Sequence, residues 1–284
     1  MDFVHAWIEG SPFARALGIQ IDALGEGSAR LLLPYQDANS NPGKALHGGC
    51  AASLAIVGAQ AVARSALGEG SGPWHTFGLQ VNYLAAAIGE GVQAEARLLR
   101  RGKELCFVEV DVATEAGKPI AHATTAVRGR FGRDPAVPAQ AVGDDGASDP
   151  GPLGRHIVKT PFIAARGIGV ELMVGGRSRL VMPWRDDNAD DAGGVHEGAA
   201  LALFDTTGAM AAWAETGPGP YKASTPSVQA QILAPLPRED LVGYGRVVQS
   251  DRELFFSEVE VAGASGQLVA RGTVLYRIVQ PEAG

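Results

Sequence analysis

The sequence has only two cysteines, Cys50 and Cys106, among 284 residues. Two are too few for the disulfide framework that is typical of small secreted proteins. The first residues, MDFVHAWIEGSPF, also lack the basic region and the apolar stretch of a signal peptide. We therefore expect a cytoplasmic protein.

Basic residues are outnumbered by acidic ones. There are 24 Lys and Arg against 31 Asp and Glu, a formal net charge of −7, and the pI is near 5.4. Because phosphate backbones and anionic membrane surfaces attract basic proteins, we expect no nucleic-acid partner and no membrane partner. The most apolar run, residues 50–63, is shorter than the roughly 20 residues that cross a bilayer, which predicts no transmembrane helix.

Histidines with metal-ligand spacing are also lacking. His5, His75, His122 and His156 are scattered along the chain, so we expect no metal site. What the sequence does have is 46% hydrophobic residues, enough for one large core or two ordinary ones.

An internal repeat favours two cores. The segment SPFARALGI from Ser11 recurs as TPFIAARGI from Thr160, and the same shift of 149 residues carries ALHGGCAASL onto GVHEGAALAL and ELCFVEVDVA onto ELFFSEVEVA. Roughly 35 of about 120 aligned positions are identical, without a gap. The sequence therefore predicts two domains, residues 1–131 and 160–284, joined by a linker at 132–159 that is rich in Pro, Gly, Ala and Asp.

Each copy predicts the same elements. A Ser-Pro or Thr-Pro start announces a short helix that ends near Gly18 or Gly167. Strand-like segments follow at 19–33 and 168–182, and then one long alanine-rich helix at 47–67 and 196–216. Four further strand segments, near 76–85, 91–101, 104–114 and 119–131 in the first copy, complete an α+β unit of one helix and five or six mainly antiparallel strands.

This order of motifs resembles a known family. PF…LGI, then HGG or HEG at the start of the alanine-rich helix, then LQVNYL and a GKEL…VEVDV hairpin, resembles the hotdog-fold acyl-CoA thioesterases of the PaaI-like and 4-hydroxybenzoyl-CoA type. The resemblance implies that each sheet wraps one central helix, and that two units pair with active sites at their interface. Here both units come from one chain, as two tandem hotdog domains that form an intrachain pseudo-dimer. The resemblance also implies an acyl-CoA substrate, with coenzyme A as part of the substrate and no other cofactor, and it allows a homodimer of such chains.

Thioester hydrolysis needs donors that stabilise negative charge on the carbonyl oxygen, and a carboxylate that activates water or attacks directly. Backbone N–H groups at the start of a helix are such donors, and Gly48 and Gly49 would let a thioester approach closely. We expect Gly49 and His196 to contact substrate. The alternative interpretation is that His-Gly-Gly simply starts a packed helix.

Asp205 lies nine residues after His196, which is the spacing of the catalytic acid in the resembling family. Helical geometry places it on a face with small and apolar residues such as Ala202 and Ala209. Its counterpart in the first copy is Ile56, which also predicts burial. A buried carboxylate is costly unless it is protonated, paired or functional, so Asp205 is a candidate for catalysis. The alternative is a structural Asp bonded to Thr225 or to the backbone.

The two copies lack different parts of a site. The first has residues that match the family's thioester-carbonyl-binding group, namely Asn41, His47 and Gly48. The second has residues that match the family's acid and its water-orienting hydroxyl, namely Asp205 and Thr225. Because the resembling enzymes combine these groups across the pair, we expect one composite catalytic site. The reciprocal combination has Ile56 at the position of the acid and adds negative charge beside the carbonyl, so we expect it to be inactive; it comprises Asp190, His196, Glu197, Ile56 and Thr76.

Two weaker candidates remain. Cys50 lies one turn after His47, but a small residue on an alanine-rich helix is more often packing than a nucleophile. The basic turn with Arg101 and Lys103 could bind the phosphates of coenzyme A, whereas charged hairpin tips are usually only solvated.

The function we expect is therefore an acyl-CoA thioesterase. A non-catalytic acyl-CoA-binding protein is the alternative from another class, although it would not need Asp205 on an apolar face. A hotdog hydratase or dehydratase is a third alternative, and the position of Asp205 after His196 fits the thioesterases better.

Overall fold

The structure is a computed structural model that describes residues 2–130 and 138–279. The first half contains three helices, three short 3-10 turns and six strands, in the order α1 (Asp2–Gly10), α2 (Pro12–Leu17), β1 (Gln20–Gly25), β2 (Ser28–Leu33), η1 (Asp37–Asn39), η2 (Pro42–Lys44), α3 (Gly48–Leu67), η3 (Glu69–Ser71), β3 (His75–Tyr83), β4 (Val92–Arg101), β5 (Leu105–Thr114) and β6 (Pro119–Arg128).

The second half repeats this order almost element for element. It contains α4 (Gly151–Ile157), α5 (Pro161–Arg166), β7 (Gly169–Val174), β8 (Arg177–Met182), η4 (Asp186–Asn188), α6 (Glu197–Thr216), β9 (Lys222–Ile232), β10 (Leu241–Ser250), β11 (Leu254–Gly263) and β12 (Leu268–Val279). The predicted repeat of one long helix and up to six antiparallel strands is confirmed.

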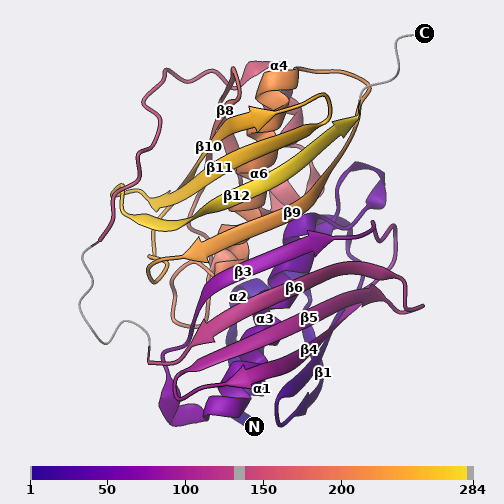
Figure 1. Cartoon of the computed structure of the whole chain (residues 1–284), viewed down its shortest axis with the longest axis vertical. Coiled ribbons are helices and arrows are strands. Elements are labelled where there is room, and N and C mark those ends of the chain that lie inside the picture. The colour runs from indigo at the N-terminus through magenta and orange to yellow at the C-terminus, as the bar shows by residue number, and fades with distance from the viewer. Residues whose placement is uncertain (1, 131–137, 280–284) are drawn as a thin grey trace.

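All twelve strands form one continuous sheet, in the order β1-β2-β4-β5-β6-β3-β9-β12-β11-β10-β8-β7. The halves join where β3 pairs antiparallel with β9, from Leu79 opposite Ala230 to Asn82 opposite Ser227. The two long helices α3 and α6 lie on the same side of this sheet and contact each other (Figure 1). The chain is therefore an intrachain pair of hotdog units.

The expected helix signals act as predicted at Ser11, Gly18 and Gly167, whereas the Thr160 side chain does not cap α5. The Ser11 hydroxyl accepts a hydrogen bond from the Ala14 N–H at the start of α2, and Gly18 ends that helix with a left-handed backbone at φ 81°. Gly167 ends α5 in the same way, at φ 71°. Only glycine adopts this conformation without strain, which explains why both copies keep it.

The core lies between the sheet and the two long helices. Nearly every residue of α3 from Gly49 to Arg64 is buried, because its many alanines allow close packing against the strands. By length and composition α3 could cross a membrane, but 83% of that apolar window is buried inside the protein. We therefore assign it as the core helix of the first half.

The expected linker at 132–159 is not irregular throughout, which corrects one expectation. Residues 151–157 form α4, and Asp149 forms a parallel bridge to Leu172 at the edge of β7. The Arg179 guanidinium also donates hydrogen bonds to the carbonyls of Asp144 and Gly146. The part of this segment that the structure describes, from residue 138, is thus packed along the second half.

Candidate active site

Asp205 lies in the middle of α6, and only 5% of it is exposed. Its Oδ1 accepts a hydrogen bond of 2.9 Å from the Thr225 hydroxyl at the start of β9. Burial raises the pKa of Asp205 to about 6, and the hydrogen bond from Thr225 partly opposes this rise. The result is a buried carboxyl group that titrates close to neutral pH.

The second oxygen of Asp205 faces the start of α3 in the other half. Gly48 is the first residue of α3, and a Cβ built on it would lie 3.0 Å from Asp205 Oδ2. The N–H of a first helical residue has no partner within its helix, so it is free to bind a ligand. A carboxylate from one half and a helix N-terminus from the other therefore meet at the same point.

Tyr83, at the end of β3, supports this contact. Its hydroxyl donates a hydrogen bond of 3.1 Å to the Gly48 carbonyl, and its ring lies 3.3 Å from the position of an added Cβ at residue 48. Tyr83 is not among the site residues that the sequence predicted. The signal that could have found it is the counterpart at the 149-residue shift, Ile232, because this is another position where the halves differ in chemistry.

His47 caps α3 and does not act as a base. Its Nδ1 accepts a hydrogen bond of 3.0 Å from the Gly49 N–H, and its ring stacks on Phe162 of the other half at 4.1 Å. Burial lowers the pKa of His47 to about 3, so the ring is neutral. With Nδ1 accepting, the ring proton is on Nε2. His47 thus orients the N-terminus of α3, and Gly49 is occupied by this cap.

A cavity of about 830 Å³ opens at this point. Five residues that the sequence predicted as catalytic line it together, namely Asn41, His47 and Gly48 from the first half and Asp205 and Thr225 from the second. The Asn41 side chain does not cap the turn η2 that it precedes. Its amide can therefore serve as a second hydrogen-bond donor beside Gly48.

Comparisons with known proteins agree with this architecture. Residues 36–129 match the family model described as the acyl-CoA thioesterase N-terminal domain. The chain is also 30% identical over 131 residues to a Halobacterium salinarum protein whose name proposes that it is an esterase; the match covers 45% of this chain and 86% of that protein. The chain belongs to the hotdog-fold thioesterase superfamily.

Two solved structures are similar over nearly the whole length. A hotdog-fold protein of unknown function from Alicyclobacillus acidocaldarius has a TM-score of 0.69 at 20% identity, and the match covers 95% of this chain and 98% of that one. The tesB protein of Mycobacterium avium subs paratuberculosis has a TM-score of 0.65 at 15% identity, covering 98% and 99%. Both likenesses show the double-hotdog fold.

Four predicted substrate contacts do not line the cavity beside Asp205, and we correct them here. Gly49 packs closely against Ala202, because a Cβ added at Gly49 would lie 2.8 Å from the Ala202 Cβ. His196 is buried at the start of α6, where its Nδ1 accepts a hydrogen bond of 2.9 Å from the Gly198 N–H. His196 repeats the capping role of His47, and it does not face the cavity.

Arg101 and Lys103 lie at the ends of the strands that are remote from the cavity. The register pairs Arg101 with Cys106, and the neighbouring Leu105 with Arg128, which is opposite His75 at the start of β3. The cavity lies at the other end of this nine-residue strand, about 25 Å away. Sequence analysis placed these cations by charge alone, without the strand register.

Cys50 is not a nucleophile. It is fully buried, its thiol lies 3.5 Å from the Asn39 carbonyl, and burial raises the pKa of the thiol. A nucleophilic cysteine needs its pKa lowered, so the packing interpretation holds.

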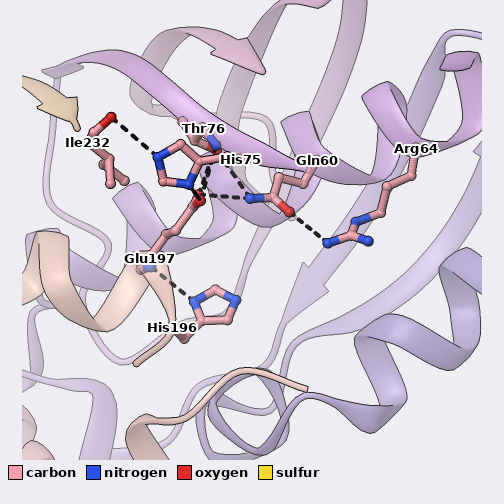
Figure 2. Close-up of polar contacts among 8 residues, drawn as sticks. Gln60, Arg64, His75, Thr76, His196, Glu197 and Ile232 are labelled. Atoms are coloured by element: carbon pink, nitrogen blue, oxygen red, sulfur yellow. Dashed lines mark hydrogen bonds and ion pairs between the residues drawn. The ribbon is translucent and has the colours of Figure 1, made fainter. Parts of the chain in front are cut away.

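The reciprocal interface between the halves is filled by Glu197 (Figure 2). Glu197 is the counterpart of Gly48, and its Oε1 lies 2.8 Å from His75 Nδ1. The Thr76 N–H donates to the same oxygen at 3.0 Å, and Gln60 Nε2 donates to Oε2 at 2.7 Å. His75 Nε2 lies 3.3 Å from the Ile232 carbonyl, so both nitrogens of the ring lie within hydrogen-bond distance of an oxygen.

This network satisfies the buried charge of Glu197. Burial opposes ionisation, but the electrostatic attraction of His75 and the hydrogen bonds from His75 and Thr76 hold the pKa of Glu197 below its ordinary value. Gln60 also accepts a hydrogen bond of 3.0 Å from Arg64, whose guanidinium stacks on Trp7 and Trp74. The interface contains Ile56 where the other has its acid. The carboxylate of Glu197 is bound there by Gln60, His75 and Thr76.

We predict that Glu197→Gln destabilises the protein. Because the pKa of Glu197 is lowered by folding, its charge stabilises the native state above the ordinary Glu pKa of 4.5, and this contribution is lost as the pH falls below it. Urea unfolding at pH 7 should show a loss of about 1–3 kcal/mol, which shrinks toward pH 4.

The matched control is Glu258→Gln. Glu258 pairs with Arg246 on the surface, where both side chains are more than half exposed, so the loss should stay below about 1 kcal/mol. Equal losses in both variants would show that the Glu197 network adds nothing beyond a surface ion pair.

Proposed function

We propose that the protein is an acyl-CoA thioesterase with one active site, formed between the two hotdog halves. The observation that carries the proposal is the position of the Asp205 carboxylate against the first residue of α3, inside an open cavity. A catalytic carboxylate and an oxyanion-binding helix N-terminus are the two groups that thioester hydrolysis requires.

The N-terminus of α3 would bind the thioester carbonyl. The Gly48 N–H donates a hydrogen bond to the carbonyl oxygen, the Asn41 amide donates a second, and the helix dipole stabilises the negative charge that develops there. Glycine is required at position 48, because a methyl group would contact both Asp205 and Tyr83. His47 keeps this helix start in place through its bond to Gly49.

Asp205 would then supply the reactive carboxylate. It either removes a proton from a water molecule that attacks the carbonyl carbon, or attacks that carbon itself and is released by water. In both routes the C–S bond breaks, coenzyme A leaves as the thiolate and takes up a proton, and the free acid is the second product. Thr225 holds Oδ1, which leaves Oδ2 directed at the cavity.

The shifted pKa suits this role. A base is most effective when its pKa lies near the working pH, and burial raises the pKa of Asp205 to about 6. A protein that only binds acyl-CoA has no use for a buried carboxylate at this position, since it costs free energy of folding.

We predict that Asp205→Asn lowers turnover of acyl-CoA by about 10²–10⁴-fold. The amide is isosteric and its oxygen still accepts the Thr225 hydrogen bond, so the fold should remain intact by circular dichroism. Thiol release from a panel of acyl-CoAs is the measurement. Undiminished turnover would refute the role of Asp205, and binding without thiol release by the unaltered protein would favour the non-catalytic alternative.

The two threonines at equivalent positions provide a matched control. Thr225→Ala removes the hydroxyl that orients Asp205 and should lower turnover, whereas Thr76→Ala alters only the filled interface and should leave turnover unchanged. An equal effect of both substitutions would contradict a single composite site.

We also predict an acidic limb in the pH profile of kcat/KM. Because the reactive form of Asp205 is ionised, kcat/KM should fall as the pH drops through about 6. The hydrogen bond from Thr225 lowers this pKa, so Thr225→Val should move the limb to higher pH. A limb that stays in place in Thr225→Val would show that another group controls it.

A further inference from the structure

The helix α4 lies between the two halves in sequence but packs on the second half. One of its faces lies directly on β7, because Gly154 is buried and an added Cβ would lie 2.9 Å from Pro150 Cβ and 3.1 Å from Val170 Cγ1. The approach is close enough that only glycine fits.

Backbone hydrogen bonds hold the start of α4 in place. The Asp149 N–H donates to the Glu171 carbonyl at 2.8 Å, and the Met173 N–H donates to the Asp149 carbonyl at 2.8 Å. The Asp149 carboxylate also accepts from the Gly151 N–H at 3.0 Å. The helix is therefore attached to the sheet edge as an additional element of the second half.

The other face of α4 borders the cavity. Leu153 and Ile157 are one helical turn apart, and both line the same cavity as Asp205. Met210 and Trp213 of α6 line this cavity as well. Trp213 is fixed by the hydrogen bond of 3.1 Å that its Nε1–H donates to the Tyr276 hydroxyl.

The cavity extends away from the reactive carboxylate along α6. Asp205, Ala209 and Trp213 follow one another at four-residue spacing, a stripe of about 12 Å along one face of the helix, and all three line the cavity. A group attached to a carbonyl carbon beside Asp205 would therefore lie along this stripe, between α6 and α4.

In the first half, large side chains fill the region that is equivalent to this cavity. The counterparts of Ala209 and Ala223 are Gln60 and Trp74, and Arg64 replaces Trp213. Gln60 bonds to Glu197, and the Trp74 ring stacks on the Arg64 guanidinium at 4.4 Å. Two alanines in the second half thus leave empty what large side chains occupy in the first.

We infer that Leu153 and Ile157 form one wall of the acyl pocket, so that the segment between the halves determines substrate specificity. The acyl group that fits is uncharged and apolar. Among the described residues that line the cavity, Arg277 is the one permanent cation, and Glu253 accepts hydrogen bonds of 2.9 and 2.6 Å from it. An acyl group with a second carboxylate would find no free cation there. This inference rests on the proposed thioesterase function.

The test compares straight-chain acyl-CoAs of increasing length on variants of α4. Ile157→Trp should narrow the pocket and lower kcat/KM for the longest accepted acyl group by about tenfold or more, while the shortest substrate is hydrolysed as before. Leu153→Ala combined with Ile157→Ala should move the preference toward longer chains. Arg155→Ala is the matched control, because Arg155 is exposed on the same helix and does not line the cavity.

A second variant tests the pocket without altering α4. Ala223→Trp introduces the side chain that the first half carries as Trp74, at a position that is exposed in the folded chain. It should lower kcat/KM most for the acyl-CoAs with the longest acyl groups, as Ile157→Trp does. A succinyl-type substrate should be hydrolysed more slowly than the apolar acyl group of similar length.

The outcomes separate this inference from the proposed function. The dependence of kcat/KM on acyl-chain length could be identical in Ile157→Trp, the double alanine variant and Arg155→Ala, while Asp205→Asn still abolishes turnover. That result would overturn the role of α4 and leave the thioesterase assignment intact. Absence of hydrolysis of every acyl-CoA by the unaltered protein would overturn both.

Discussion

The antiparallel pairing of β3 with β9 fixes how the two halves meet, and the candidate site depends on it. This pairing places α3 and α6 against each other so that the N-terminus of each helix reaches the middle of the other half. One end of the junction, where β3 ends and β9 begins, holds Tyr83, Thr225 and the cavity. The other end holds His75, Ile232 and Glu197. One strand junction thus creates two equivalent interfaces, and any change in register would separate the groups at both.

The two interfaces have diverged in volume as well as in charge. Small residues, Ala209 and Ala223, leave space beside Asp205, whereas Gln60 and Trp74 occupy the equivalent space beside Glu197. In a homodimer of single hotdog units both interfaces would carry the same residues. Duplication within one chain removes this symmetry, so one interface can keep an open cavity while the other contributes contacts between the halves.

The first helices of the two halves show the same division. In the first half α1 contacts α3, and its Trp7 stacks on Arg64 at 3.9 Å. In the second half α4 packs on β7 instead, which leaves Leu153 and Ile157 at the edge of the cavity. The first helix of the first half therefore covers the filled interface, whereas the first helix of the second half borders the open cavity.

Much of the fold could be predicted because the repeat presents each signal twice. The Gly18 and Gly167 helix ends and the His47 and His196 helix starts follow from local chemistry, since few residues satisfy those backbone positions. The grouping of Asn41 and Gly48 with Asp205 and Thr225 came from the resemblance to known thioesterases and from the unequal halves. In the structure these residues line one cavity.

The errors arose where tertiary structure decides. Arg101 has the charge to bind a phosphate, but the strand register puts it at the opposite end of β3. The helix α4 has only seven residues and contains proline and glycine, so its sequence resembles a linker, and packing on β7 stabilises it. His196 was predicted to contact substrate, yet it uses Nδ1 to cap its own helix.

The two buried carboxylates differ in what surrounds them, and this difference separates structure from chemistry. Glu197 has the His75 ring and several donors within hydrogen-bond distance, so its pKa falls although it is buried. Among the residues that the structure describes, the Thr225 hydroxyl is the side-chain group that bonds to Asp205, and burial raises the pKa of Asp205 to about 6. A carboxylate whose two oxygens are both hydrogen-bonded is stabilised in its unreacted form, because reaction would break those hydrogen bonds. A carboxylate with one satisfied oxygen and one that faces a helix N-terminus is held in position and remains available as a base or nucleophile. The distribution of hydrogen-bond donors across one pseudo-symmetric junction therefore favours a structural role for Glu197 and supports the chemical role that we propose for Asp205.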